Sequence, residues 1–208
     1  MKSEHCQAVV LSALDYGETD RIVTLFTLEH GRLRAFAKSA RKSRKRFGGG
    51  LEPGNRLDVT LGLKVDGLSR LERGDATSGC ATTRDQLESL ALTMYCCELV
   101  DALTPEGHPL PRLYRLLCAL LDYLNLAAAN QSDRRFFEIN LLNILGYRPQ
   151  TDDKRLHSLQ DCLRTGKFGL VHLSDEALTY GGRILDTAIA SNTVRPLKSL
   201  TFLTDVLK

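Results

Sequence analysis

Apolar and polar side chains alternate along the N-terminal part of the chain with the two-residue period of β-strands. The clearest case runs from Leu57 to Leu63, where every second residue is apolar. Polar turn residues separate the runs, and Asp66-Gly67 is typical of a β-hairpin turn. The pattern predicts five strands, at residues 6–14, 21–27, 31–38, 56–64 and 68–73.

Five short strands, with the longest connection between the third and the fourth, predict a small β-barrel. The five-stranded OB-fold fits this spacing, and the spacing does not exclude an SH3-like barrel. The strand at 21–27 carries apolar residues on both faces, with Ile22 and Phe26 on one and Val23 and Leu25 on the other. We therefore expect this strand to be covered on both sides, on one of them by the rest of the chain.

The apolar period changes to that of amphipathic helices from residue 83 onward. Thr83 and Gln86 match a capping box at the start of a first helix. Ser132-Asp133 are predicted to cap a third helix that Gly146 ends. A helix beginning at Ser174 would be interrupted by Gly181-Gly182. The fold class is therefore α+β, with an OB-fold barrel in residues 1–80 followed by a mostly α-helical domain in residues 81–208.

Residues 31–50, GRLRAFAKSARKSRKRFGGG, contain eight Lys and Arg and no acidic residue. Strand geometry sends Leu33, Ala35 and Ala37 to one face and the cations, with Phe36, to the other. The second half of this stretch is predicted to be a mobile loop. Cations along the phosphates and a ring against a base suit single-stranded nucleic acid. The predicted DNA-binding residues are Arg32, Arg34, Phe36, Lys38, Arg41, Lys42, Arg44, Lys45, Arg46, Tyr16 and Arg21.

The distribution of charge predicts that a polyanion would bind to the N-terminal part. Residues 1–80 hold 14 Lys and Arg against 10 Asp and Glu, whereas residues 81–208 hold 14 against 15. Other readings of the basic stretch stay open. It could be a solvated loop with Phe36 packed under a neighbouring domain, or it could serve an acidic protein or an anionic membrane.

Enzymatic chemistry finds little support in the sequence. It contains no H-E-x-x-H, no G-x-S-x-G and no G-x-x-x-x-G-K-[ST] motif. Glu138 lies beside Arg134 and Arg135, where a structural ion pair is favoured over general base catalysis. The polar start and the absence of a long apolar run lead us to expect a cytosolic protein without a membrane span.

Three segments resemble the RecO family of bacterial recombination mediators. Residues 16–27, YGETDRIVTLFT, resemble the N-terminal signature of the family, and residues 31–47 resemble its basic continuation. Residues 137–149, FEINLLNILGYRP, resemble the helix that ends in L-G-Y-x-P. Their order and spacing are consistent with one match along the whole chain. The resemblance implies an OB-fold followed by a helical domain, in a nucleoid-associated protein without enzymatic activity.

The resemblance also implies partners and a role in DNA repair. Family members bind single- and double-stranded DNA and anneal complementary strands. With RecR, they help to load RecA onto DNA coated by the single-stranded-DNA-binding protein, whose acidic tail they also bind. Such a tail needs an apolar pocket rimmed by cations, and the candidates in the helical domain are Arg112, Arg115, Arg134 and Arg135. The competing hypothesis is an interaction protein whose basic loop docks an acidic protein without DNA.

One departure from the family concerns zinc. Many members carry two C-x-x-C pairs after the L-G-Y-x-P helix, and these cysteines bind the metal. Residues 150–159 contain no cysteine here, and none follows Gly181-Gly182. Cys162 alone cannot make the site. We therefore expect no cofactor and no structural zinc, with residues 150–192 forming a degenerate subdomain held together by hydrophobic packing.

Overall fold

The computed structural model divides the chain into two compact units. The first, the barrel unit, contains Met1–Ala81 and Cys97–Tyr114, and the second, the helical unit, contains Thr82–Cys96 and Arg115–Lys208. The residues that the structure describes are 3–47, 50–64, 67–78, 85–149, 157–165 and 167–207. The predicted capping residue Thr83 therefore lies outside the described residues, as do Gly48 and Gly49.

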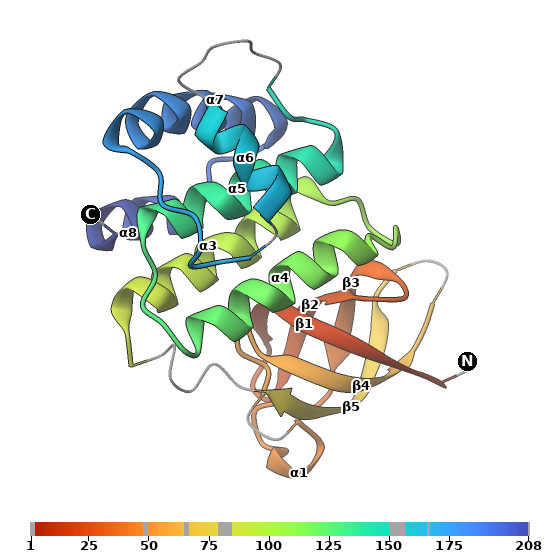
Figure 1. The fold of residues 1–208 in the computed structure, drawn as a ribbon. Helices are drawn as coiled ribbons and strands as arrows, with labels where there is room; N and C mark the ends of the chain where they lie inside the picture. The colour runs from red at the N-terminus through yellow and green to blue at the C-terminus, as the bar shows by residue number, and fades with distance from the viewer. Residues whose placement is uncertain are drawn as a thin grey trace. The chain divides into compact units, whose positions relative to one another are not determined.

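Five strands form the barrel (Figure 1). They are β1 (Ser3–Tyr16), β2 (Asp20–Thr27), β3 (Gly31–Ala37), β4 (Arg56–Gly62) and β5 (Ser69–Ser78). The long strand β1 pairs with β4 through its first half and with β2 through its second half. The short parallel pairing of β3 with β5 closes the barrel in the order β1-β2-β3-β5-β4. This arrangement confirms the predicted OB-fold.

The barrel interior is filled by the apolar side chains that point to the inner face of each strand. Leu33, Ala35 and Ala37 are buried there, as their alternation predicted. The prediction of a loop after β3 was wrong at its end, because residues Arg44–Phe47 form one helical turn, α1. The Phe47 side chain is only 2% exposed and belongs to the barrel core. One buried ring thus fixes the end of the basic stretch to the barrel.

The second strand is covered on both faces in its C-terminal half, whereas Ile22 near its start is only partly buried. Val23 and Leu25 point into the barrel, whereas Phe26 is buried on the outside. The ring centroid of Phe26 lies 6.1 Å from that of Tyr114, near the start of helix α4 (Pro111–Leu124). The thiol of Cys97 donates to the carbonyl oxygen of Val10 at 3.8 Å, within the same unit. Residues 97–114 therefore complete the outer packing of the barrel unit.

The rest of the described chain contains helices joined by turns and loops. Their bounds are Leu87–Leu103 (α3), Pro111–Leu124 (α4), Gln131–Leu145 (α5), His157–Thr165 (α6), Gly182–Asn192 (α7) and Lys198–Val206 (α8), with a π-helical turn, η2, at Ala177–Gly181.

The start of α5 lies two residues earlier than predicted. Asn130 is its N-cap, and its side chain accepts a hydrogen bond from the backbone N–H of Asp133. The Asp133 carboxylate in turn accepts from the backbone N–H of Asn130, which completes a capping box. Gly146 ends the helix in the left-handed conformation with φ of 80°, as predicted. Asp133 is thus the third helical residue rather than the cap.

The prediction that Gly181-Gly182 interrupts a helix was wrong. The chain passes through η2 directly into α7, so the glycine pair lies within continuous helical structure. A Cβ atom on Gly182 would lie 2.6 Å from a guanidinium nitrogen of Arg135. The missing side chain therefore makes room for an arginine that packs against the helix.

Gly31 offers a test of the barrel unit. Its φ is +67°, and a Cβ atom there would lie 1.9 Å from the carbonyl oxygen of His108. Gly17 has a φ of +61° but nothing within 4 Å, so it is a matched control for backbone strain alone. We expect G17A to lower the free energy of unfolding by about 1 kcal/mol and G31A by about 3 kcal/mol or more, in urea titrations. Equal losses in the two variants would contradict the close approach of residue 108.

Candidate nucleic-acid interface

An exposed apolar row crosses the outer face of three strands. Strand pairing places Leu14 opposite Ile22 and Ile22 opposite Phe36. The Tyr16 ring meets the Phe36 ring edge-on, with 6.0 Å between centroids and 84° between planes. Leu14 is 66% exposed and Tyr16 57%, so the row is not covered by the barrel unit itself. Exposed apolar surface is one of the features that mark binding sites, which makes this row a candidate.

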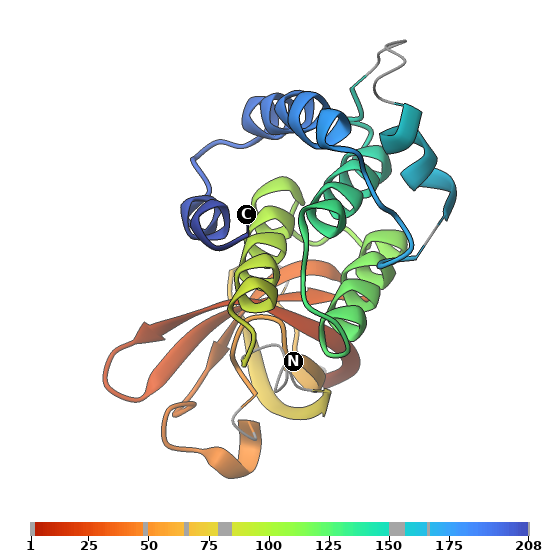
Figure 2. The same cartoon turned by 60° about the vertical axis from the view of Figure 1, so that its left-hand side comes forward.

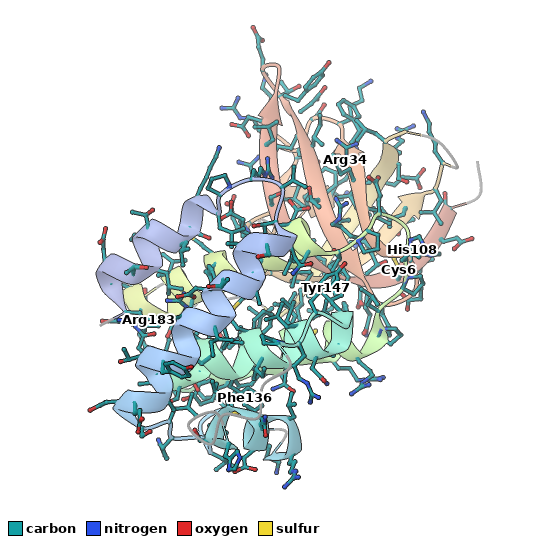
Figure 3. All side chains as sticks on the ribbon, turned by 90° about the horizontal axis from the view of Figure 1, so that it is seen from above. Cys6, Arg34, His108, Phe136, Tyr147 and Arg183 are labelled. Carbon is teal, nitrogen blue, oxygen red and sulfur yellow. The ribbon has the colours of Figure 1, made fainter. Side chains whose placement is uncertain are left out.

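Cations flank this apolar row. Arg34 precedes Phe36 by two residues and lies on the same outer face, where its side chain is exposed (Figure 3). Arg70 of β5 pairs directly with Phe36 across the closing strands and is also exposed. Sequence reasoning missed Arg70, because only the strand register shows that it lies beside the ring. Arg34 approaches a single carboxylate, that of Glu106, at 3.8 Å.

The basic segment, defined here as residues 38–46, follows β3. Lys38, Arg41, Lys42 and Lys45 have exposed side chains. Arg46 is half-buried, since its guanidinium donates to the carbonyl oxygen of Lys38 at 2.6 Å and lies over the Phe47 ring at 5.0 Å. The side chain of Arg44, which was predicted to contact DNA, lies outside the described residues.

The basic segment is attached to the turn between β1 and β2. The backbone N–H of Arg41 donates to the carbonyl oxygen of Thr19 at 3.0 Å, and its guanidinium donates to the carbonyl oxygen of Glu18 at 3.1 Å. Figure 2 shows the β1–β2 hairpin and the chain leading to α1 projecting from the barrel. The exposed cations therefore lie next to the strands that carry the apolar row.

Two of the predicted DNA contacts, Arg32 and Arg21, make ion pairs within the barrel unit. The Arg32 guanidinium donates to the carbonyl oxygen of Thr104 at 2.9 Å and pairs with the Asp101 carboxylate at 3.3 Å. The Arg21 guanidinium pairs with Glu52 at 3.0 Å and with Asp15 at 2.9 Å. Hydrogen bonding to Glu52 and Asp15 raises the pKa of Arg21. Both guanidinium groups therefore have carboxylate partners within the barrel unit, and Arg32 also holds the backbone carbonyl of Thr104.

The candidate interface therefore consists of one apolar row and a set of exposed cations around it. Aromatic rings can stack on unpaired bases, while the cations contact the phosphates of the same strand. The ring of Phe36 lies next to that of Tyr16. The cations are Arg34, Arg70, Lys38, Arg41, Lys42 and Lys45.

Two of the arginines predicted to hold a protein tail are buried. Arg134 is 4% exposed and Arg135 is 7% exposed, inside the helical unit. Both pair with the fully buried carboxylate of Glu138, at 2.8 and 2.7 Å, and both reach Asp186 of α7. Their assignment as the rim of a surface pocket does not fit this structure. The prediction that Glu138 makes a structural ion pair is confirmed.

The buried cluster is extended by Tyr95. Its hydroxyl donates to Glu138 at 2.7 Å, and the Arg134 guanidinium lies over its ring at 5.3 Å. Burial raises the pKa of Tyr95 well above its ordinary value, so the phenol keeps the proton that it donates. The other two candidate arginines, Arg112 and Arg115, have exposed side chains on α4.

The cysteine nearest to the expected zinc region, Cys162, is buried in the helical unit. Burial raises the pKa of the Cys162 thiol to about 11, whereas zinc binds the thiolate. Within the described ranges, no group of three or more His, Cys, Asp or Glu side chains could hold a metal. Apolar packing is present in the same region, where the Phe168 ring meets Phe136 at 4.7 Å and Tyr123 at 6.0 Å between centroids. Figure 3 labels Phe136 in the helical unit.

Comparison with known families agrees with the barrel and with the motifs on it. Residues 1–79 match the family described as recombination protein O, N terminal, and residues 84–156 match its C-terminal counterpart. The chain belongs to the RecO family. Among the helices of its described part, none is both long and apolar enough to cross a membrane.

Several relatives are named DNA repair protein RecO. The one from Pelobacter propionicus is 46% identical, with 99% of this chain and 98% of the relative aligned. The one from Geobacter sulfurreducens is 42% identical, with 95% of this chain and 96% of the relative aligned. The first alignment spans 241 positions, more than the 208 residues of this RecO-family chain. The relative therefore has residues without a counterpart here.

The buried ionic cluster gives a prediction about stability. In E138Q, two buried guanidinium groups lose a carboxylate, which typically costs about 3–5 kcal/mol. We expect a loss of this size in the free energy of unfolding, measured by urea titration monitored by circular dichroism. The control is E88Q, since Glu88 is exposed on α3 and its change should stay within about 0.5 kcal/mol. A change in E138Q no larger than that in E88Q would contradict the structural role of the cluster.

Proposed function

We propose that this RecO-family protein binds single- and double-stranded DNA and anneals complementary strands during DNA repair in bacteria. The observation that supports this most is the exposed apolar row of an OB-fold barrel flanked by exposed cations. Strands of the same barrel face bind oligonucleotides in other OB-folds. Phe36 and Tyr16 would stack on bases, while the surrounding Lys and Arg side chains would contact phosphates.

Annealing follows physically from such a surface. Two complementary strands repel each other through their phosphates, and a cationic surface that holds both lowers this repulsion. Five predicted contact residues have exposed side chains, namely Arg34, Lys38, Arg41, Lys42 and Lys45. If each neutralises one phosphate, the plot of log K against log salt concentration for single strands has a slope of roughly −3.5.

The protein partners are proposed from the family likeness. We expect RecR to bind this chain, and together they would help to load RecA onto DNA coated by the single-stranded-DNA-binding protein, in the cytoplasm at the nucleoid. The acidic tail of that protein would meet exposed cations. Of the four arginines predicted for it, Arg112 and Arg115 remain candidates because their side chains are exposed.

The alternative is an interaction protein that uses the basic segment to dock an acidic partner without DNA. Basic segments serve both purposes. The apolar row favours DNA, because a purely electrostatic dock needs no exposed rings beside its cations. If the segment served only an acidic protein, neither single- nor double-stranded oligonucleotides would bind.

The first experiment is annealing of two complementary oligonucleotides, followed by fluorescence. The variant is K42A/K45A, which removes two exposed cations of the basic segment, and the matched control is K167A/K198A, which removes two exposed lysines of the helical unit. Losing two phosphate contacts makes the salt slope for a single strand less steep by about 1.4 and slows annealing. The control removes the same charge and should leave the slope unchanged.

Two results would contradict this function. If wild-type protein binds no oligonucleotide at low salt, the acidic-partner alternative replaces it. If K42A/K45A and K167A/K198A weaken binding equally, net charge rather than the basic segment accounts for the affinity.

We also propose that the helical unit folds without zinc. Apolar packing around Phe168 and the buried thiol of Cys162 support this, because the metal would need thiolates that the described residues do not bring together. A strong chelator is therefore expected to leave the melting temperature of the purified protein unchanged. A fall in the melting temperature that added zinc reverses would contradict a zinc-free fold.

A further inference from the structure

The basic segment adopts one defined backbone conformation that includes a strained residue. Ser39 has a φ of +55° and is the one non-glycine residue with positive φ in the described part of the chain. A left-handed conformation costs a residue with a side chain about 1 kcal/mol or more. The backbone N–H groups of Lys42 and Ser43 both donate to the carbonyl oxygen of Ser39, so the turn at Ser39 sets the direction of the cations that follow.

A carboxylate from the neighbouring strand holds Ser39 in this conformation. Oδ1 of Asp20, the first residue of β2, accepts the backbone N–H of Ser39 at 2.6 Å. The hydroxyl of Thr19 donates to the same oxygen at 2.9 Å and so orients the carboxylate. The hydrogen bond from the Ser39 amide lowers the pKa of Asp20, because the backbone N–H stabilises the ionised carboxylate.

The position of Asp20 is otherwise unfavourable for a DNA-binding surface. It pairs with Tyr16 in the strand register, so its negative charge lies among the residues proposed to meet phosphates and bases. A negative charge beside a bound polyanion lowers affinity. If this surface binds DNA, the Asp20 carboxylate must favour binding in another way that outweighs its repulsion of phosphates.

We propose that Asp20 is a positioning residue for DNA binding, which it promotes by holding the Ser39 turn so that Arg41, Lys42 and Lys45 project together. This inference rests on the proposed function. It also gives a physical role to the turn motif Tyr16–Asp20, whose other backbone carbonyls, from Glu18 and Thr19, accept hydrogen bonds from Arg41.

The sign of the effect distinguishes positioning from simple electrostatics. Removing a negative charge should tighten binding of a polyanion if only charge matters. Loss of the carboxylate loosens the turn if Asp20 acts by position, and binding then weakens although the protein has become more positive. The two accounts predict opposite changes for the same variant, D20A.

The experiment measures affinity of the full-length protein for a fluorescent single-stranded oligonucleotide at fixed salt. We expect D20A to bind about fivefold to tenfold more weakly, the scale of one typical intramolecular hydrogen bond. We expect D20N to bind at least as tightly as wild type, because the amide oxygen can still accept the Ser39 N–H. The double variant D20A/S39G should recover much of the loss, since glycine adopts positive φ without a side-chain penalty.

D58A is the matched control, because it removes an exposed carboxylate from β4 of the same barrel. It should bind as tightly as wild type or slightly more tightly. Melting temperatures of all variants separate loss of the turn from loss of the fold, and rescue by S39G is not expected if D20A simply unfolds the protein.

The outcomes separate this inference from the proposed function. Wild-type protein that fails to bind DNA contradicts both. Wild-type protein that binds, with D20A binding equally or more tightly, overturns the positioning role of Asp20 and leaves the proposed function standing. A weakened D20A that S39G does not rescue, or an equally weakened D20N, also overturns it, since the effect then does not act through the turn.

Discussion

Repulsion between like charges is the constraint on which the barrel unit depends. Eight Lys and Arg side chains lie between residues 32 and 46, without an acidic residue among them. The fold must hold these charges within a short distance of one another. It does so by giving those cations that point into the structure their own acceptors, as Arg32 has in Asp101 and Arg46 has in the carbonyl of Lys38. The side chains of Lys38, Lys42 and Lys45 are left exposed.

Anchoring of the basic segment uses apolar and polar contacts at its two ends. At its far end the Phe47 ring enters the barrel core, and hydrophobic burial offsets the repulsion along the chain. At its near end the backbone of Ser39 and Arg41 is hydrogen-bonded to the turn between β1 and β2. Segments bound at both ends keep more of their side chains in one direction, which lowers the entropy lost when a ligand orders them.

The helical unit solves a different charge problem. Arg134 and Arg135 are adjacent in sequence and both are buried, which is costly unless each guanidinium is paired. Glu138 and Asp186 supply the carboxylates, and Gly182 supplies the room for Arg135 to pack against α7. The cluster joins α5 to α7 within the helical unit. Ionic and apolar packing together hold these helices.

Periodicity predicted the elements well, because burial on one face leaves a regular trace in the sequence. The alternation through Leu33, Ala35 and Ala37 placed the barrel interior correctly. The apolar residues on both faces of 21–27 predicted the burial of Val23, Leu25 and Phe26, but not the partial exposure of Ile22. Features that depend on three-dimensional pairing were not predictable in this way. Arg70 lies beside Phe36 only through the closing strand pair, and Phe47 enters the core although its neighbours in sequence are cations.

Local helix rules were less reliable than periodicity where several residues could serve the same role. Asn130, Ser132 and Asp133 can each cap a helix, and the structure selects Asn130 because Asp133 then completes the reciprocal bond. Gly181-Gly182 lies inside helical structure since tertiary contact with Arg135 outweighs its weak helix propensity. Burial of Arg134 and Arg135 had no signal in their sequence, where charged residues ordinarily indicate exposed surface.

Photo-crosslinking of the wild-type protein to a single-stranded oligonucleotide that contains 5-iodouracil tests the central claim most directly. The crosslinked peptides would be identified by mass spectrometry. The account predicts adducts on Tyr16 or Phe36, the two rings of the exposed apolar row. Adducts confined to residues 115–207 of the helical unit would contradict it, because the bases would then contact a surface other than the barrel.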